Sequence, residues 1–395
     1  MLRRALLLAL ALGLVAPQVA EAHGSHWDRI ADVGPFRARV SATIANGQLD
    51  YTIDLRDRQG RPVRGAFIRV FARTPGGELL DADAVAVGST YEARLPASDL
   101  AEWRDWTIDT GIEAGGSNVT FSYRPPAPSW RWHAIWPVLI GIALTLAAFG
   151  QAFVRLRRRG RSDHAPWSRA ALAVAATAIL GIALCSPIDA IGERYLLSVH
   201  MLQHVMLGDL APALVLLAVR GPLAVFLVPK PILRRVAHWE GPRAFLAAVL
   251  HPAIAVSLWA ITYATWHLPP LYQAALRNPT VHELEHATFT ICGLLVWAQL
   301  IDPTRRLRLT RKARLGVALG TFLAGQLLAD VLIFSYSPYY GQYAAEPWRI
   351  AGIGALADQR IAGVVMMTEQ LATFGVCIAI LLRRTVRAQA IAVSA

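Results

Sequence analysis

Histidines and methionines inside apolar segments are the residues of this chain best suited to bind a metal. The most informative stretch is 196–219, LLSVHMLQHVMLGDLAPALVLLAV, which is apolar and long enough to cross a bilayer as a helix of roughly 20 residues. His200 and His204 lie four residues apart in it, so they share one helical face. Titratable groups inside a membrane segment are energetically costly and by default indicate function. We therefore expect part of a metal site here.

The other candidate ligands follow in later apolar segments or at their boundaries. They are His267, the pair His282 and His286, and the adjacent Met366 and Met367. Imidazole and thioether groups are copper ligands, and imidazole also suits zinc and iron. The side chains expected to support these ligands from outside the coordination shell are Asp330, Asp358 and Met201. Simpler roles remain open, since His267 also suits an interfacial hydrogen-bonding residue and the methionines also suit packing.

Composition indicates an integral membrane protein. The chain has 395 residues, of which 55% are hydrophobic, and its formal net charge is +12. Such a charge is compatible with nucleic acid binding, but the arginines gather between the hydrophobic segments, so we expect no nucleic acid partner. The three cysteines, Cys185, Cys292 and Cys377, lie within or at the end of hydrophobic segments. They form neither a disulfide framework nor a CxxC redox motif.

The first 22 residues have the pattern of a secretory signal peptide. Arg3 and Arg4 precede an apolar core, and Ala20-Glu21-Ala22 forms a cleavage site. Cleavage there makes His23 the mature amino terminus. Its α-amine and imidazole then form a candidate chelating pair for Cu(II), although a disordered polar terminus is the alternative.

Residues 23–128 form the predicted periplasmic domain. Between 37 and 124, alternating runs such as LDYTIDL and AFIRVFA are separated by turn signals such as Asn46-Gly47, which predicts an antiparallel β-sandwich of about 90 residues. A Pro-rich linker at 125–128 follows it. The sandwich segment contains no histidine, cysteine or methionine, so we expect the metal ligands elsewhere.

Residues 129–387 form the predicted membrane domain, followed by a cytoplasmic tail at 388–395. Its seven expected transmembrane helices are 134–154, 168–185, 196–219, 244–264, 281–301, 315–334 and 361–382. The expected inner segments and tail hold twenty basic residues, and the outer loops hold four. This asymmetry orients the chain with its sandwich outside and its carboxyl terminus inside. The same orientation places the candidate ligands in the outer leaflet.

The sequence His282-Glu283-Leu284-Glu285-His286 matches the HExxH motif of zinc proteases, in which the glutamate is the general base. A local explanation competes with this one. Thr280 and Glu283 match a capping box at a helix start, and Glu285 suits the first turn through the helix dipole. We therefore treat an intramembrane zinc metalloprotease as the alternative function.

The ordered motifs resemble the seven-helix CtaG-type cytochrome c oxidase assembly factors over roughly residues 136–384. The resemblance is carried by HMLQHVM at 200–206 with Ala211-Pro212, by WHLPP at 266–270 with Tyr272, by HELEH at 282–286, and by DQRIAGVVM at 358–366. It implies help in assembling a copper-containing oxidase through its copper centres, without enzymatic turnover. A second group that shares the name uses one helix and a cysteine pair, which this chain lacks, so its thiolate mechanism is not implied.

These observations predict a copper-binding oxidase assembly factor in a bacterial inner membrane. The implied partners are oxidase subunits, periplasmic copper donors and the lipid bilayer. A haem protein, with histidines as axial ligands, and a copper-transport or resistance protein remain alternatives. A transporter needs polar groups along the whole crossing, whereas the inner half offers mainly Asp209 and His251.

Overall fold

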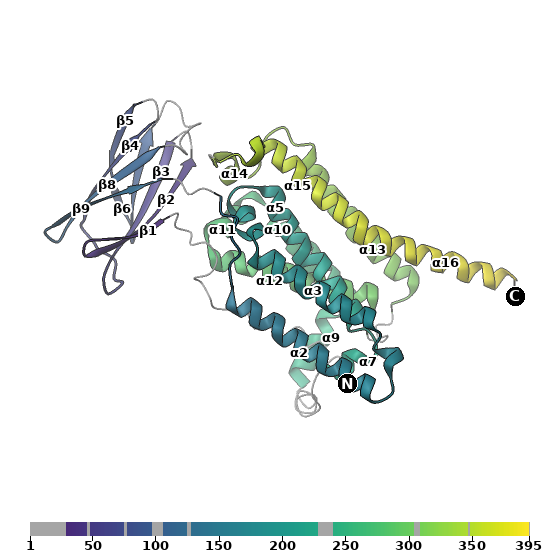
Figure 1. Ribbon diagram of the computed structural model, residues 1–395. Helices are drawn as coiled ribbons and strands as arrows, with labels where there is room; N and C mark the ends of the chain where they lie inside the picture. The colour runs from purple at the N-terminus through teal and green to yellow at the C-terminus, as the bar shows by residue number, and fades with distance from the viewer. Residues whose placement is uncertain are drawn as a thin grey trace.

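The computed structural model describes most of the chain, with a β domain followed by a helical bundle (Figure 1). The residues it describes are 29–45, 48–74, 77–96, 106–124, 128–227, 240–303, 309–346 and 348–394. The expected signal peptide and His23 lie outside these residues.

The β domain is an antiparallel sandwich, as the alternating sequence runs predict. Its two sheets have the strand orders β1-β2-β3-β7-β6 and β5-β4-β8-β9. The strands are β1 Arg29–Val33, β2 Phe36–Ala45, β3 Gln48–Asp57, β4 Phe67–Arg73, β5 Leu79–Asp83, β6 Val85–Val87, β7 Thr90–Pro96, β8 Thr107–Ala114 and β9 Ser117–Tyr123. Every second residue of β3 and β4 is buried, and these side chains share one core between the sheets.

The remaining chain is an α-helical membrane domain. Among the described residues, six helical spans are long and apolar enough to cross a membrane: Trp136–Arg158, Ser162–Cys185, Leu197–Ala218, Pro279–Ile301, Arg311–Ile333 and Ala355–Val386. The corresponding helices are α2 Trp136–Arg158, α3 Trp167–Cys185, α5 Leu197–Val205 with α6 Ala211–Ala218, α12 Pro279–Ile301, α13 Arg311–Ile333, and α15 Ala355–Gln370 with α16 Val376–Ser394.

The expected fourth transmembrane helix, 244–264, is divided into two shorter helices. These are α9, Glu240–Val249, and α10, Pro252–Trp266. Proline lacks a backbone N–H and disfavours helical geometry in the preceding residue. His251 accordingly has an extended conformation, with φ −68° and ψ 130°, and Pro252 begins the new helix. The prediction of one continuous helix here was wrong.

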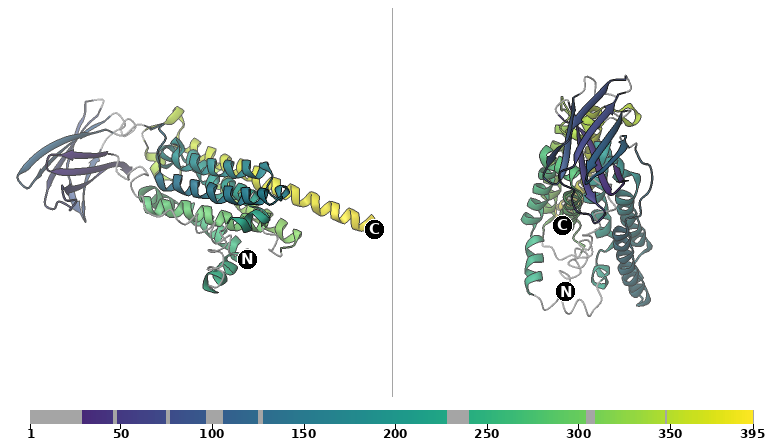
Figure 2. Two further views of the ribbon diagram at one scale, coloured as in Figure 1. Left: turned by 60° about the horizontal axis from the view of Figure 1, so that its bottom comes forward. Right: turned by 90° about the vertical axis from the view of Figure 1, so that its left-hand side faces the viewer.

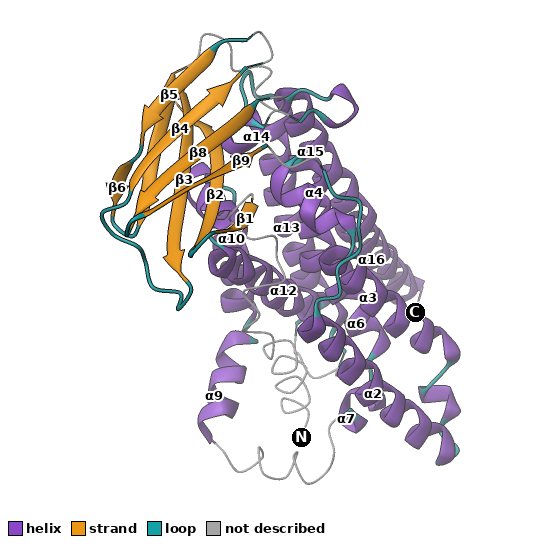
Figure 3. Ribbon diagram, turned by 60° about the vertical axis from the view of Figure 1, so that its left-hand side comes forward, coloured by secondary structure: helices purple, strands orange, loops and turns teal. Residues whose placement is uncertain are grey.

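Shorter helices at the ends of the long ones carry several residues of the candidate site. They are α4 Pro187–Arg194, α7 Pro222–Phe226, α11 Pro269–Arg277 and α14 Gly341–Ala345. The sandwich lies at one end of the bundle, where β2 contacts α14, and α16 extends from the other end (Figures 2 and 3).

Two glycines allow the close helix contacts that position the site. A Cβ on Gly293 of α12 would lie 1.8 Å from the carbonyl oxygen of Gly208, in the π-helical turn Met206–Leu210 that joins α5 to α6. A Cβ on Gly192 of α4 would lie 2.9 Å from the Cα of His200. Only a residue without a side chain fits at such distances. Helix α4 therefore meets α5 backbone to backbone, and α12 meets the π-helical turn after α5 in the same way.

Candidate metal centre

The two histidine pairs predicted from the sequence meet in one cluster. His200 and His204 project from α5, and His282 and His286 project from α12. One ring nitrogen from each of the four lies within 4.8 Å of all the others. All four side chains are buried. Four imidazoles within this distance form a donor set that suits copper or zinc. We call them the four-histidine cluster.

Hydrogen bonds outside the cluster fix the orientation of His282. Its Nδ1 lies 2.8 Å from Oε1 of Glu193, at the end of α4. The carboxylate accepts the Nδ1–H, so the lone pair of Nε2 faces the other histidines. A carboxylate behind a histidine in this way is the usual second layer of a metal site.

Two tyrosines orient His200 in the same way. The hydroxyl of Tyr343 donates to the carbonyl oxygen of Gly192 at 2.7 Å, so its oxygen can accept the Nδ1–H of His200 at 2.9 Å. The hydroxyl oxygen of Tyr272 lies 2.7 Å from the same nitrogen. Burial raises the pKa of Tyr343 well above its usual range, so this hydroxyl stays protonated and keeps donating to Gly192.

These bonds leave one nitrogen of each ring facing the other. Nε2 of His200 and Nε2 of His282 are 3.2 Å apart, and the opposite nitrogen of each ring is hydrogen-bonded, to the two tyrosine hydroxyls for His200 and to Glu193 for His282. Either an N–H shared between the two nitrogens or a metal ion bound by both lone pairs makes this contact favourable. The two rings are thus placed where both can bind one metal ion.

His204 and Glu285 add further unsatisfied groups beside the cluster. Neither ring nitrogen of His204 and neither carboxylate oxygen of Glu285 has a hydrogen-bond partner among the described residues. Both side chains are buried, and Oε1 of Glu285 lies 3.8 Å from Nε2 of His204. Buried polar groups without partners are destabilising, which fits a site that a cation completes.

Asp358 acts on the cluster through the start of α5. Its Oδ2 accepts from the amide of Leu197 at 2.6 Å, and its Oδ1 accepts from the amide of Ser198 at 3.2 Å and from the Ser198 hydroxyl. A carboxylate on the free amides of a helix start stabilises that helix. Asp358 thus supports the helix turn that carries His200, and it touches none of the ligand atoms.

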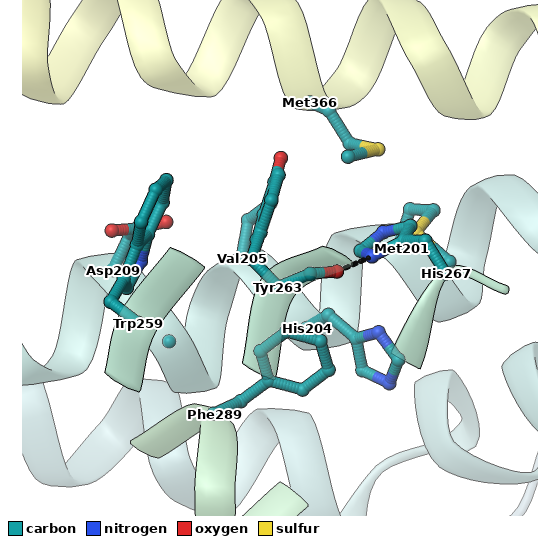
Figure 4. A pocket seen from close by; sticks show the side chains of 10 residues that line it. Met201, His204, Val205, Asp209, Trp259, Tyr263, His267, Phe289 and Met366 are labelled. Atoms are coloured by element: carbon teal, nitrogen blue, oxygen red, sulfur yellow. Dashed lines mark hydrogen bonds between the residues drawn. The ribbon is translucent and has the colours of Figure 1, made fainter. Parts of the chain in front are cut away.

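The remaining predicted ligands do not join the four histidines. His267, Met201 and Met366 line a small cavity next to the cluster, and His204 lines it too (Figure 4). Met367 is not among its lining residues and packs partly buried against neighbouring apolar side chains. Asp330 is exposed on α13, so the structure does not bring it to a histidine.

The HELEH segment is arranged differently from the expected capping box. The helix begins at Pro279, and Oδ1 of Asn278 caps it by accepting from the amides of Thr280 at 3.0 Å and Val281 at 3.3 Å. The capping-box prediction for Thr280 was therefore wrong. Glu283 is half-buried and lies outside the group of converging ligands, whereas Glu285 is fully buried beside them.

Sequence reasoning missed Glu193 and Tyr343 as supporting residues. Neither belongs to a metal-binding motif, and both come from short helices far from α12 in sequence. Glu193 carries a usable signal, because it is an acidic residue directly after Gly192 at the predicted membrane boundary. Tyr343 has no comparable signal.

Comparisons with known proteins add a family assignment. A family model described as "Cytochrome c oxidase caa3 assembly factor" matches residues 124–388. Uncharacterized proteins of Mycobacterium bovis and Mycobacterium tuberculosis are each 30% identical over 221 residues, which cover 51% of this chain and 32% of theirs. The match thus spans about a third of the length of these curated relatives. No solved structure matches the chain.

Proposed function

Because the chain belongs to the cytochrome c oxidase caa3 assembly factor family, we propose that its four-histidine cluster binds copper for the assembly of the oxidase. The observation that carries this proposal is the convergence of one ring nitrogen from each of four buried histidines within 4.8 Å of one another. Glu193 and Tyr343 support two of these rings, those of His282 and His200, from behind. In this proposal copper is cargo, and the protein catalyses no reaction.

The location of the cluster supports delivery at the outer face of a bacterial inner membrane. The ligands sit near the beginnings of α5 and α12, at the bundle end closest to the sandwich (Figure 1). The basic residues of the membrane domain are concentrated in the connecting segments and tail of the opposite end of the bundle, as expected for a cytoplasmic side. Copper would then enter from a periplasmic donor, and the sandwich would dock that donor or an oxidase subunit.

The geometry favours copper handling over a protease or a haem protein. In HExxH enzymes the two histidines of the motif bind zinc and the first glutamate is the general base. Here four histidines converge, and the fully buried glutamate beside them is Glu285, whereas Glu283 is half-buried. The rings of His204 and His286 have their centroids 5.4 Å apart, and those of His200 and His282 are 5.2 Å apart. A haem with one axial histidine from each helix would not fit between these rings unless α5 and α12 moved apart.

Paired measurements of copper and oxidase test the proposal. Purified full-length protein and the His204→Ala, His282→Ala and His286→Ala variants are analysed for bound copper. A deletion strain complemented with each variant is assayed for oxidase activity and for the copper and haem contents of the oxidase. We expect each histidine variant to lower bound copper and oxidase copper together, with haem falling less.

Glu283→Gln is the matched control on the same helix. It removes the base that a protease would need, a loss that typically slows catalysis by about 10²–10⁴-fold, but it removes no proposed copper ligand. We expect this variant to bind as much copper as the wild type and to restore the same oxidase activity. If Glu283→Gln abolishes assembly while copper still binds, the copper proposal is wrong and the protease interpretation replaces it.

A further inference from the structure

The cavity beside the four-histidine cluster has its own set of soft-metal donors. Met201 from α5, Met366 from α15 and His267 from the end of α10 all line it. Figure 4 shows the sulfur atoms of both methionines on the same side of the cavity as the His267 ring, with Asp209 on the opposite side. These donors come from three helices and meet around one space.

The ring of His267, which lines this cavity, has one nitrogen without a hydrogen bond to any residue that the structure describes. Its Nδ1–H donates to the carbonyl oxygen of Tyr263 at 2.7 Å, which leaves the lone pair on Nε2. That nitrogen is buried and has no hydrogen-bond partner among the described residues. Burying such an acceptor without a partner costs free energy, unless something in the cavity binds it.

The sulfur atoms indicate what that ligand is. Met201 and Met366 are both 1% exposed, so neither sulfur is available to an aqueous partner. Thioether ligands select Cu(I) over harder cations. The nearest carboxylate in the lining, that of Asp209, already accepts from the indole of Trp297 at 3.2 Å. The donors are thus neutral, which suits a monovalent soft cation better than a divalent one.

We propose that Met201, Met366 and His267 form a second metal site, separate from the four-histidine cluster, that binds Cu(I). This inference rests on the copper function proposed above. His204 lines this cavity and also belongs to the cluster, so it forms the wall between the two sites. Copper could pass from thioether to imidazole ligands through this wall without returning to water. The proposal involves ligand exchange only and requires no change in oxidation state.

Cu(I) titration of the purified full-length protein tests this inference. Binding is measured without oxygen against a colorimetric Cu(I) chelator, and X-ray absorption reports whether sulfur atoms neighbour the copper. The test variant carries Met201→Leu and Met366→Leu, which conserve side-chain volume. The control is Met367→Leu, which changes the next residue of the same helix but lies outside the cavity lining.

We expect the double variant to lose sulfur scattering and to bind this Cu(I) at least about 10-fold more weakly, because even an outer-shell change can have that effect. Met367→Leu should match the wild type, and His282→Ala should keep the sulfur signal. If the wild-type spectrum contains only nitrogen neighbours, or if both methionine variants behave alike, the second site is refuted while the cluster proposal stands. If the wild type binds no copper at all, the function proposed above fails as well.

Discussion

The contact between Glu193 and His282 allows a quantitative test of the cluster. The two side chains are 19% and 3% exposed, so water competes little for their 2.8 Å hydrogen bond. A hydrogen bond to a charged group contributes about 1.5–3 kcal/mol. Removing a carboxylate behind a ligand histidine typically weakens metal binding by about 10–100-fold, which corresponds to roughly 1.4–2.8 kcal/mol. The two estimates agree.

We therefore expect Glu193→Ala to weaken copper binding by about 10–100-fold. Glu193→Gln keeps an oxygen that can accept from Nδ1 but removes the negative charge, so its effect should be smaller, at most about 10-fold. The measurement is a competition titration of purified protein against a chelator of known affinity. Glu283→Gln, on the same helix as His282, removes one carboxylate without touching the proposed ligands and should leave affinity unchanged.

The result that would refute this reasoning is specific. If Glu193→Ala binds copper as tightly as the wild type while His282→Ala does not, Glu193 does not orient the ligand. If neither substitution has an effect, His282 is not a ligand, and the facing nitrogens of His200 and His282 hold a proton instead.

Three other predictions concern what positions the cluster. Asp358→Ala should lower the free energy of unfolding by about 1–2 kcal/mol, because α5 loses its cap, and thermal unfolding with and without copper should show both a lower Tm and weaker copper binding. Gly293→Ala should cost about 1–3 kcal/mol through overpacking against Gly208, whereas Gly316→Ala, where an added Cβ meets nothing within 4 Å, should not destabilise the protein. Reporter fusions after Arg159 should indicate cytoplasm and fusions after Asn278 periplasm, and a reversal at either position would contradict the charge-based orientation.

The fold was largely predictable because its determinants are local. Alternation along β3 and β4 encodes a sheet with one buried face, and long apolar runs encode the bundle. The division of the expected fourth helix had a local signal as well, in Pro252. The short helices α4, α11 and α14 were harder to predict, because their five to nine residues carry too little periodicity.

The cluster was only half predictable because its assembly depends on contacts between distant segments. Spacing of four residues places His200 with His204, and His282 with His286, but it says nothing about whether the two pairs meet. Their meeting depends on the contact between Gly208 and Gly293, which no local pattern encodes. The polarity of the bundle interior was underestimated for a similar reason, since Glu369 is buried near the middle of the last span, Ala355–Val386, and shares no motif with the histidines.

The HELEH segment shows how helix geometry selects which of its two glutamates is buried beside the histidines. Successive residues of an α-helix are rotated by about 100°, so positions three and four residues apart share a face and adjacent positions do not. From His282, the residues on the same face are Glu285 and His286. Both are buried, His286 in the cluster and Glu285 beside it. Glu283, one residue on, is half-buried outside it. The carboxylate that this helix buries beside the four histidines is therefore that of Glu285, at 3.8 Å from His204.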